Sequence, residues 1–224
     1  MKLPERATIV EVGPRDGLQN EPVPVDTATK TAFIEGLAAA GLKQIEATSF
    51  VNPKRIPQLA DAMDVLGALP ALDGVVWSAL VPNMKGLERA IEAGVKRIAV
   101  FTAASETFTQ KNIGMTIGQS VAAFGEVIPA ALAAGMSVRG YVSTVIACPY
   151  EGAVAPSRVV DVTERLLSLG VDEVSLGDTI GVGVPTEVEG LLATVLARVA
   201  PSKIALHFHD TCGTALANVL VGLQ

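Results

Sequence analysis

The chain has 224 residues, of which 50% are hydrophobic and 18% are charged, and its formal net charge at pH 7 is −6. This composition allows a large buried core, and an acidic chain without a basic tract is not typical of a nucleic-acid-binding protein. Its two cysteines do not make a disulfide framework, and no targeting segment or run of about 18 apolar residues stands out. We therefore expect a cytoplasmic protein with no nucleic-acid or membrane partner.

Helix-like segments and short β-rich runs alternate along the whole chain. Glycine just past a helix supplies the left-handed C-cap that turns the chain back into a strand, and four helix-like segments end in this way, at Gly41, Gly94, Gly135 and Gly170. Three helix starts are marked by N-terminal signals, at Asp26, Pro156 and Pro185. The β-rich runs predict seven strands, over residues 8–12, 44–48, 75–81, 97–101, 138–142, 173–176 and 203–209.

Strict alternation of strand and helix predicts one parallel sheet with right-handed crossovers. A doubly wound sheet and a TIM barrel both satisfy this pattern. The barrel is favoured because its active site is built at the carboxyl ends of the strands, and polar residues lie near the end of nearly every predicted strand. These residues are Arg15, Asp16, Glu46, Ser49, Asn83, Ser143, Thr144, Asp178, His207 and His209. We expect an α/β TIM (β/α)8 barrel with about seven of its strands present, as a single catalytic domain over residues 1–224.

The first predicted strand leads directly into the run GPRDGLQNE, residues 13–21. Asp16 offers oxygen ligands of the kind that a hard divalent cation prefers, and Arg15 carries a permanent charge and a planar fork of donors suited to an oxyanion. A surface turn with a weak ion pair is the alternative interpretation.

Two further carboxylates are candidates for the site. Glu46 lies within an apolar strand, where a carboxylate needs a partner, and Arg15 is the candidate partner. Such a pair would aim Arg15 rather than act on a substrate directly. Asp178 follows another strand among glycines and is a candidate base, a partner of a metal site or a simple turn former.

The only two histidines of the sequence, His207 and His209, lie one residue apart at the end of the last predicted strand. A strand sends residues i and i+2 to the same face, and Asp210 follows directly. Two neutral imidazoles beside a carboxylate are typical ligands of a divalent metal, although ordinary hydrogen-bonded histidines are the alternative.

Several of these runs closely resemble the 3-hydroxy-3-methylglutaryl-coenzyme A lyase family, within the broader DRE-TIM metallolyases. The likeness covers essentially the whole chain and is carried by residues 12–21, 45–51, 139–143, 148–152, 176–183 and 207–211. The arginine-aspartate run combined with the paired histidines is its most specific part.

The resemblance implies a divalent metal, Mg²⁺ or Mn²⁺, bound by Asp16, His207 and His209. It implies retro-Claisen cleavage of 3-hydroxy-3-methylglutaryl-CoA to acetyl-CoA and acetoacetate, with no redox cofactor. In this reaction Arg15 would stabilise the enolate oxygen of the departing acetyl-CoA, Glu46 would orient Arg15, and Asp178 would assist proton transfer at the substrate hydroxyl.

Substrate contacts and a homodimer are also expected from the resemblance. The residues expected to bind the acyl-CoA substrate are Arg15, Gln19, Ser49 and Asn112. Coenzyme A phosphates would lie near basic loop residues, for which Lys54, Arg55 and Lys111 are available, although such residues are more often merely solvated.

Members of the family carry a further metal ligand, an asparagine, and a catalytic cysteine on a glycine-rich loop after an eighth strand. Neither this strand nor this loop is recognised among the 224 residues. Cys148 matches a different family segment and is expected to be a partly buried structural thiol, and Cys212 is expected to be incidental. A related aldol or Claisen enzyme acting on another acyl-CoA or 2-oxo acid, and an inactive truncated fragment that only binds metal, remain alternatives.

Overall fold

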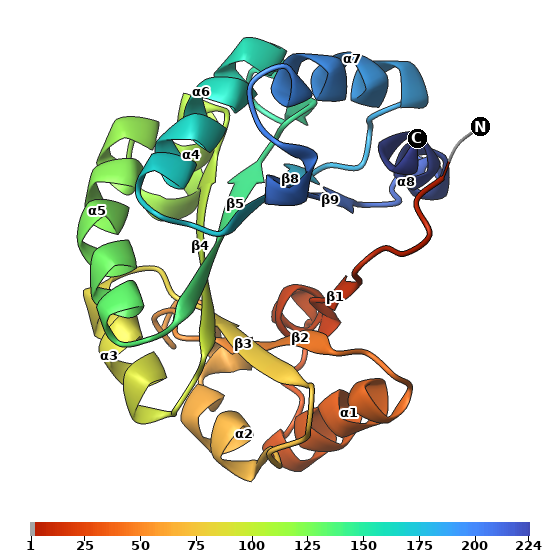
Figure 1. Cartoon of the computed structure of the whole chain (residues 1–224). Helices are drawn as coiled ribbons and strands as arrows, with labels where there is room; N and C mark the ends of the chain where they lie inside the picture. Colours follow the sequence, from red (N-terminus) through yellow and green to blue (C-terminus); the bar gives the residue numbers. More distant parts are fainter. Residues whose placement is uncertain (1–2) are drawn as a thin grey trace. The chain divides into compact units, whose positions relative to one another are not determined.

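The computed structural model describes residues 3–224, which form two compact units. One unit contains residues 7–100 and 130–137. The other contains residues 101–129 and 138–224 together with the N-terminal segment up to Arg6. Both units are built from parallel strands and helices that alternate along the chain (Figure 1).

The unit that begins at residue 7 is built on parallel strands in the order β1-β2-β3-β4. Its strands are β1 (Val10–Glu11), β2 (Gln44–Ser49), β3 (Val76–Leu80) and the first part of β4 (Arg97–Ala103). Its helices are α1 (Thr27–Ala39), α2 (Ala62–Ala68) and α3 (Met84–Glu92), with a π-helical turn at Gly13–Gly17 and 3-10 turns at Leu18–Asn20 and Pro57–Leu59. Helices α1 and α2 lie side by side and both contact β2 (Figure 1).

The second unit contains the parallel strands β5 (Ser137–Ser143), β8 (Glu173–Asp178) and β9 (Ile204–Phe208), in that order. Its helices are α4 (Glu106–Ile113), α5 (Ile117–Ala133), α6 (Pro156–Ser168), α7 (Pro185–Leu196) and α8 (Ala215–Leu223), with a 3-10 turn at Pro201–Lys203. Two short strands, β6 (Ala147–Cys148) and β7 (Gly152–Ala153), form an antiparallel hairpin.

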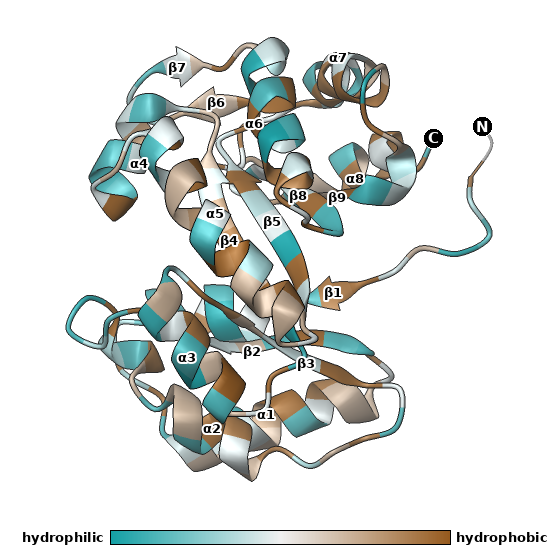
Figure 2. Ribbon diagram, turned by 60° about the vertical axis from the view of Figure 1, so that its left-hand side comes forward, coloured by the Kyte–Doolittle hydropathy of each residue, from teal (hydrophilic) through white to brown (hydrophobic). Residues whose placement is uncertain are grey.

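Apolar side chains from strands and helices form the core of each unit. In the first, Ile34 of α1, Ile45 of β2 and Ile98 of β4 are fully buried. In the second, Leu166 of α6 and Leu176 of β8 are fully buried. Hydrophobic and hydrophilic residues alternate along helices such as α3, which buries one face and exposes the other (Figure 2).

All seven predicted strands are present, with ends that differ by a few residues. The strand predicted over 8–12 is shorter, Val10–Glu11, and those predicted over 97–101 and 173–176 extend to Ala103 and Asp178. The predicted glycine C-caps are confirmed, since the four glycines have φ between 72° and 105°. Asp26 caps α1 as predicted, because its side chain accepts a hydrogen bond from the Thr29 amide at 2.9 Å. The β6-β7 hairpin was not predicted.

Within residues 3–224, no single helix is long and apolar enough to cross a membrane, and α4 and α5 meet that criterion only as a pair bent by 59°.

Candidate active site

The turn after β1 buries Arg15. The amides of Arg15 and Asp16 both donate to the Val12 carbonyl, at 3.0 and 2.6 Å, and the Leu18 amide donates to the Gly13 carbonyl five residues earlier, which makes Gly13–Gly17 a π-helical turn. The Gly13 amide donates to a carboxylate oxygen of Glu11 at 2.7 Å, which ties the turn to β1. The Arg15 residue is 8% exposed, so the alternative of an open surface turn is wrong.

Arg15 is held between two carboxylates. Its Nε donates to Glu46, which is 1% exposed on β2, and its Nη1 donates to Asp16 Oδ1 at 2.8 Å. The predicted Arg15–Glu46 pair is therefore confirmed. Gln19 Nε2 donates to the same Asp16 oxygen at 3.0 Å. These bonds orient the guanidinium and the Asp16 carboxylate together, since charges removed from water need fixed partners.

The two histidines lie at the carboxyl end of β9 with their rings close together. His207 is on the strand and His209 directly follows it, and their ring centroids are 4.9 Å apart, as expected for residues two apart on one face. His209 Nδ1 lies 2.7 Å from the Thr179 carbonyl oxygen. A carbonyl only accepts, so Nδ1 carries the proton, and this is the tautomer in which Nε2 is able to bind a metal ion.

Asp210 has a different role from the histidines. Its Oδ1 accepts a hydrogen bond from the Ala215 amide at 2.9 Å, at the first residue of α8. The carboxylate that follows the histidines in the sequence thus binds a main-chain amide at the start of α8.

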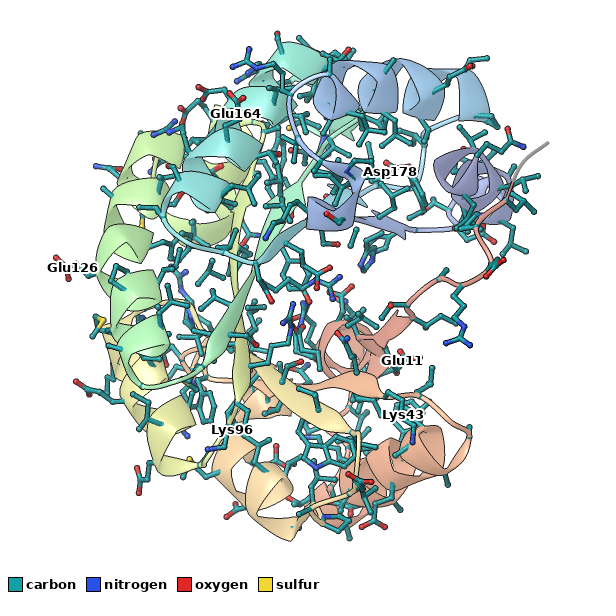
Figure 3. The ribbon with its side chains drawn as sticks, viewed as in Figure 1. Glu11, Lys43, Lys96, Glu126, Glu164 and Asp178 are labelled. Atoms are coloured by element: carbon teal, nitrogen blue, oxygen red, sulfur yellow. The ribbon has the colours of Figure 1, made fainter. Side chains whose placement is uncertain are left out.

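Asp178 is fully buried at the end of β8 (Figure 3). Its Oδ2 accepts from the Gly183 amide at 2.8 Å, while its Oδ1 has no hydrogen-bond partner among residues 3–224. One carboxylate oxygen of Asp178 therefore binds the local turn, and the other is buried without a hydrogen bond from the described residues. A Cβ on Gly181 would lie 2.6 Å from the His209 carbonyl oxygen, which shows how closely this loop approaches the residue after β9.

Thr179 is a site residue that the sequence did not reveal. Its carbonyl orients His209, and its hydroxyl accepts from the Thr144 amide at 2.8 Å. Thr144 lies just beyond β5 with φ of 59°, an uncommon conformation for a β-branched residue. The contact to His209 uses a main-chain carbonyl, which every residue type has. The identity of residue 179 therefore does not allow this contact to be predicted from the sequence.

The remaining predicted residues lie in varied surroundings. Ser49 is buried at the end of β2, where its hydroxyl donates to the Leu80 carbonyl at 3.2 Å. Asn112 is exposed on α4, and Lys54 and Arg55 are exposed in the segment between β2 and α2. Lys111 Nζ lies 3.9 Å from the centroid of the Tyr150 ring. The substrate-binding roles of these residues stay predictions.

The two cysteines are both free. Cys148 is fully rather than partly buried and its sulfur accepts a hydrogen bond from the Ser105 hydroxyl at 3.0 Å, whereas Cys212 is exposed. The contact with Ser105 agrees with the structural role expected for Cys148.

The strands are parallel and alternate with helices, and acidic, basic and imidazole side chains lie at their carboxyl ends. These features define an enzyme of the TIM-barrel class. A family model described as HMGL-like matches residues 6–224. Hydroxymethylglutaryl-CoA lyase, mitochondrial, of Bos taurus is 52% identical over 221 residues, which are 99% of this chain and 68% of that protein. The chain belongs to the hydroxymethylglutaryl-CoA lyases, a family of enzymes. Curated relatives at about this identity include proteins named as mitochondrial and as cytoplasmic.

Solved structures agree with this assignment. The crystal structure of hydroxymethylglutaryl-CoA lyase from Pseudomonas aeruginosa matches 100% of this chain and 74% of that chain, with a TM-score of 0.97 and 48% identity. An HMG-CoA lyase from Acinetobacter baumannii, solved in complex with coenzyme A and 3-methylmalate, matches 96% of this chain and 70% of that chain, with a TM-score of 0.91 and 38% identity. The TIM-barrel prediction is therefore confirmed.

Proposed function

We propose that this chain cleaves 3-hydroxy-3-methylglutaryl-CoA to acetyl-CoA and acetoacetate with the help of a divalent metal ion. The observation that carries the proposal is 52% identity to a hydroxymethylglutaryl-CoA lyase across 99% of the chain. The buried Arg15–Glu46 pair and the oriented His209 supply groups that this reaction needs.

Asp16, His207 and His209 are the residues that would bind the metal. Each offers one ligand atom, a carboxylate oxygen or an imidazole nitrogen, and such donors bind divalent metals. The resemblance to the family implies Mg²⁺ or Mn²⁺. The Thr179 carbonyl keeps His209 in the tautomer that a metal requires. When bound, the ion would lower the pKa of the substrate hydroxyl and fix the hydroxyl and carboxylate of the substrate.

The reaction removes one proton from the substrate hydroxyl, moves one electron pair and adds one proton to the enolate carbon, so that no proton is gained or lost overall. Asp178 accepts the proton of the tertiary hydroxyl, which is the role that the resemblance to the family implies for it. The C–O bond becomes the ketone of acetoacetate, the neighbouring C–C bond breaks, and its electrons pass to the thioester as an enolate. Arg15, fixed by Glu46, stabilises the negative charge on the thioester oxygen, and the enolate carbon then takes up a proton.

An acyl-CoA substrate agrees with the coenzyme A in the related Acinetobacter baumannii structure. Gln19, Ser49 and Asn112 are the proposed substrate contacts besides Arg15. A cytoplasmic location and a homodimer complete the proposal.

The test is an assay of acetoacetate and acetyl-CoA formation by the chain expressed from its complete reading frame. We expect equal amounts of both products, loss of activity with EDTA and recovery with Mg²⁺ or Mn²⁺. Other 3-hydroxyacyl-CoA compounds and 2-oxo acids are assayed in parallel. A higher kcat/KM for one of those compounds, or full activity in a His207→Ala, His209→Ala double variant, would show that the proposal is wrong.

A further inference from the structure

Helix α8 carries one buried polar side chain, Asn218. The helix reads ALANVLVGL, and Asn218 is its only polar residue. It is fully buried, whereas Leu216 on the same helix is 84% exposed. An amide in this position needs hydrogen-bond partners that an apolar side chain would not need.

The partner of Asn218 is the loop that follows β8. Asn218 Nδ2 donates to the Gly183 carbonyl oxygen at 2.8 Å, and the hydroxyl of Thr214 donates to the same oxygen at 2.8 Å. The amide of Gly183 in turn donates to Asp178 Oδ2 at 2.8 Å. Gly183 is thus held at its carbonyl by α8 and its preceding residue, and holds Asp178 with its amide.

Gly183 lies close to the Asp178 carboxylate. A Cβ at this position would lie 2.9 Å from Asp178 Oδ2 and 3.2 Å from Ile146 Cγ1, so there is no space for a side chain. Because the Gly183 amide is bonded to Asp178 Oδ2 at 2.8 Å, a shift of Gly183 would change the position of that carboxylate or break the bond. Small displacements of a reacting group have large effects on rate, because the reacting atoms must be in near-attack geometry.

Packing alone gives no reason for an asparagine at this position. Its Oδ1 is buried without a hydrogen-bond partner among residues 3–224. Leucine has a similar branched shape and would bury no polar atom, so the retained amide indicates a need for the bond to Gly183.

We propose that Asn218 is a positioning residue that, together with Thr214, acts through Gly183 to hold the Asp178 carboxylate in place. The inference rests on the proposed function, in which Asp178 accepts the proton of the substrate hydroxyl. Asn218 touches neither substrate nor metal in this scheme, so its removal affects the chemical step rather than substrate binding.

The kinetic test uses Asn218→Leu, which keeps the shape of the side chain and removes the donor. We expect kcat to fall about tenfold or more and KM to stay within about twofold. In an Asp178→Asn background the same change should have no further effect on kcat, whereas a general loss of structure would lower kcat by the same factor in both backgrounds. Leu216→Ala, on the exposed side of α8, is the control variant, and its kcat should equal that of the unaltered chain.

Thr214 provides a second, matched pair of variants. Thr214→Val removes the hydroxyl donor at constant shape and should lower kcat, while Thr214→Ser retains the hydroxyl and should restore most of the activity. This comparison keeps the test valid if Asn218→Leu folds poorly.

Amide hydrogen exchange gives a readout that does not depend on activity. In Asn218→Leu we expect faster exchange of the Gly183 amide, by about tenfold, with no change for the Gly177 amide of β8. Unchanged exchange at Gly183 and unchanged kcat would overturn the inference. Absence of cleavage by the unaltered chain would instead overturn the proposed function, and the exchange result would still show whether Asn218 holds Gly183.

Discussion

The Arg15–Glu46 pair illustrates how a buried charge is used in this protein. Both side chains are almost completely removed from water, which costs free energy that their mutual attraction only partly offsets. Apolar pairs often stabilise a fold equally well, and the buried charge of Arg15 agrees with the role proposed for it at the thioester oxygen. The fixed Nε contact means that Glu46 determines the direction of the guanidinium.

Changing Glu46 to glutamine tests this interpretation. Glu46→Gln keeps the shape but removes the charge that orients Arg15, so we expect kcat to fall about 100-fold. The free energy of unfolding should decrease by about 2 kcal/mol, the contribution of a hydrogen bond to a charged group. Steady-state kinetics and urea denaturation measure the two effects.

The Lys30–Asp61 pair in the same unit provides the control. Asp61 accepts from Lys30 Nζ at 2.6 Å and from the Thr27 hydroxyl at 2.7 Å, and joins α1 to the start of α2. Asp61→Asn should lower stability similarly while leaving kcat within about twofold. If both variants lost activity in proportion to their lost stability, the orienting role of Glu46 would be refuted.

At the scale of elements, the β6-β7 hairpin is joined to two helices by one carboxylate. Glu151, in the turn of the hairpin, accepts from the Thr107 amide of α4 at 2.7 Å and from Arg158 of α6 at 3.0 Å. The hydrogen bond from the Thr107 amide is the main reason why the pKa of Glu151 is lowered to about 2, and Arg158 adds to it.

This lowered pKa predicts a stability difference that depends on pH. Because the carboxylate is favoured in the folded state, its contribution is fully present above the ordinary pKa of about 4.5 and is lost as the pH falls through about 2. Glu151→Gln should therefore lower the free energy of unfolding at pH 7 by about 1 kcal/mol, and by less at pH 3. Denaturant unfolding at both pH values measures this.

A substitution elsewhere separates this effect from the general loss of one acidic group. Glu126 is exposed on α5 (Figure 3) and is replaced by glutamine as the control. An equal loss of stability for Glu151→Gln at pH 7 and pH 3 would contradict the prediction.

The elements differ in how well the sequence predicts them. Six of the seven predicted strands are five to seven residues long, and the seventh, β1, was found as part of a longer β-rich run over residues 8–12. The β6-β7 hairpin was not predicted, because its two-residue strands lie in no such run. The π-helical turn at Gly13–Gly17 was also missed, since the bond from the Leu18 amide to the Gly13 carbonyl joins main-chain groups and leaves no mark on residue types.

For the molecule as a whole, the predictable part of the site is the part set by strand periodicity. His207 and His209 share a face because they are two residues apart. Glu46 lies on β2, Asp178 ends β8 and Arg15 follows β1, all of them strands that could be located from the sequence. The orienting contacts could not be predicted, because the Thr179 carbonyl and the Gly183 amide are main-chain groups that every residue type can supply.

A metal bound by Asp16 near the start of the chain and by His207 and His209 near its end should stabilise the whole fold. Binding to the folded state alone, at a metal concentration about 100 times the dissociation constant, adds about 2.7 kcal/mol, which raises Tm by about 5–10 °C for a chain of this size. We expect this rise in Tm with Mn²⁺ and its reversal by EDTA. In His207→Ala and in Asp16→Asn, titration calorimetry should show at least about 100-fold weaker binding of Mn²⁺.

Asp210→Asn is the matched control. It removes a negative charge next to His209 and retains an oxygen that can accept a hydrogen bond from the Ala215 amide. Its affinity for Mn²⁺ should therefore stay within about threefold of that of the unaltered chain. Equal weakening in Asp210→Asn and Asp16→Asn would show that general acidity, rather than ligation by these three residues, attracts the ion.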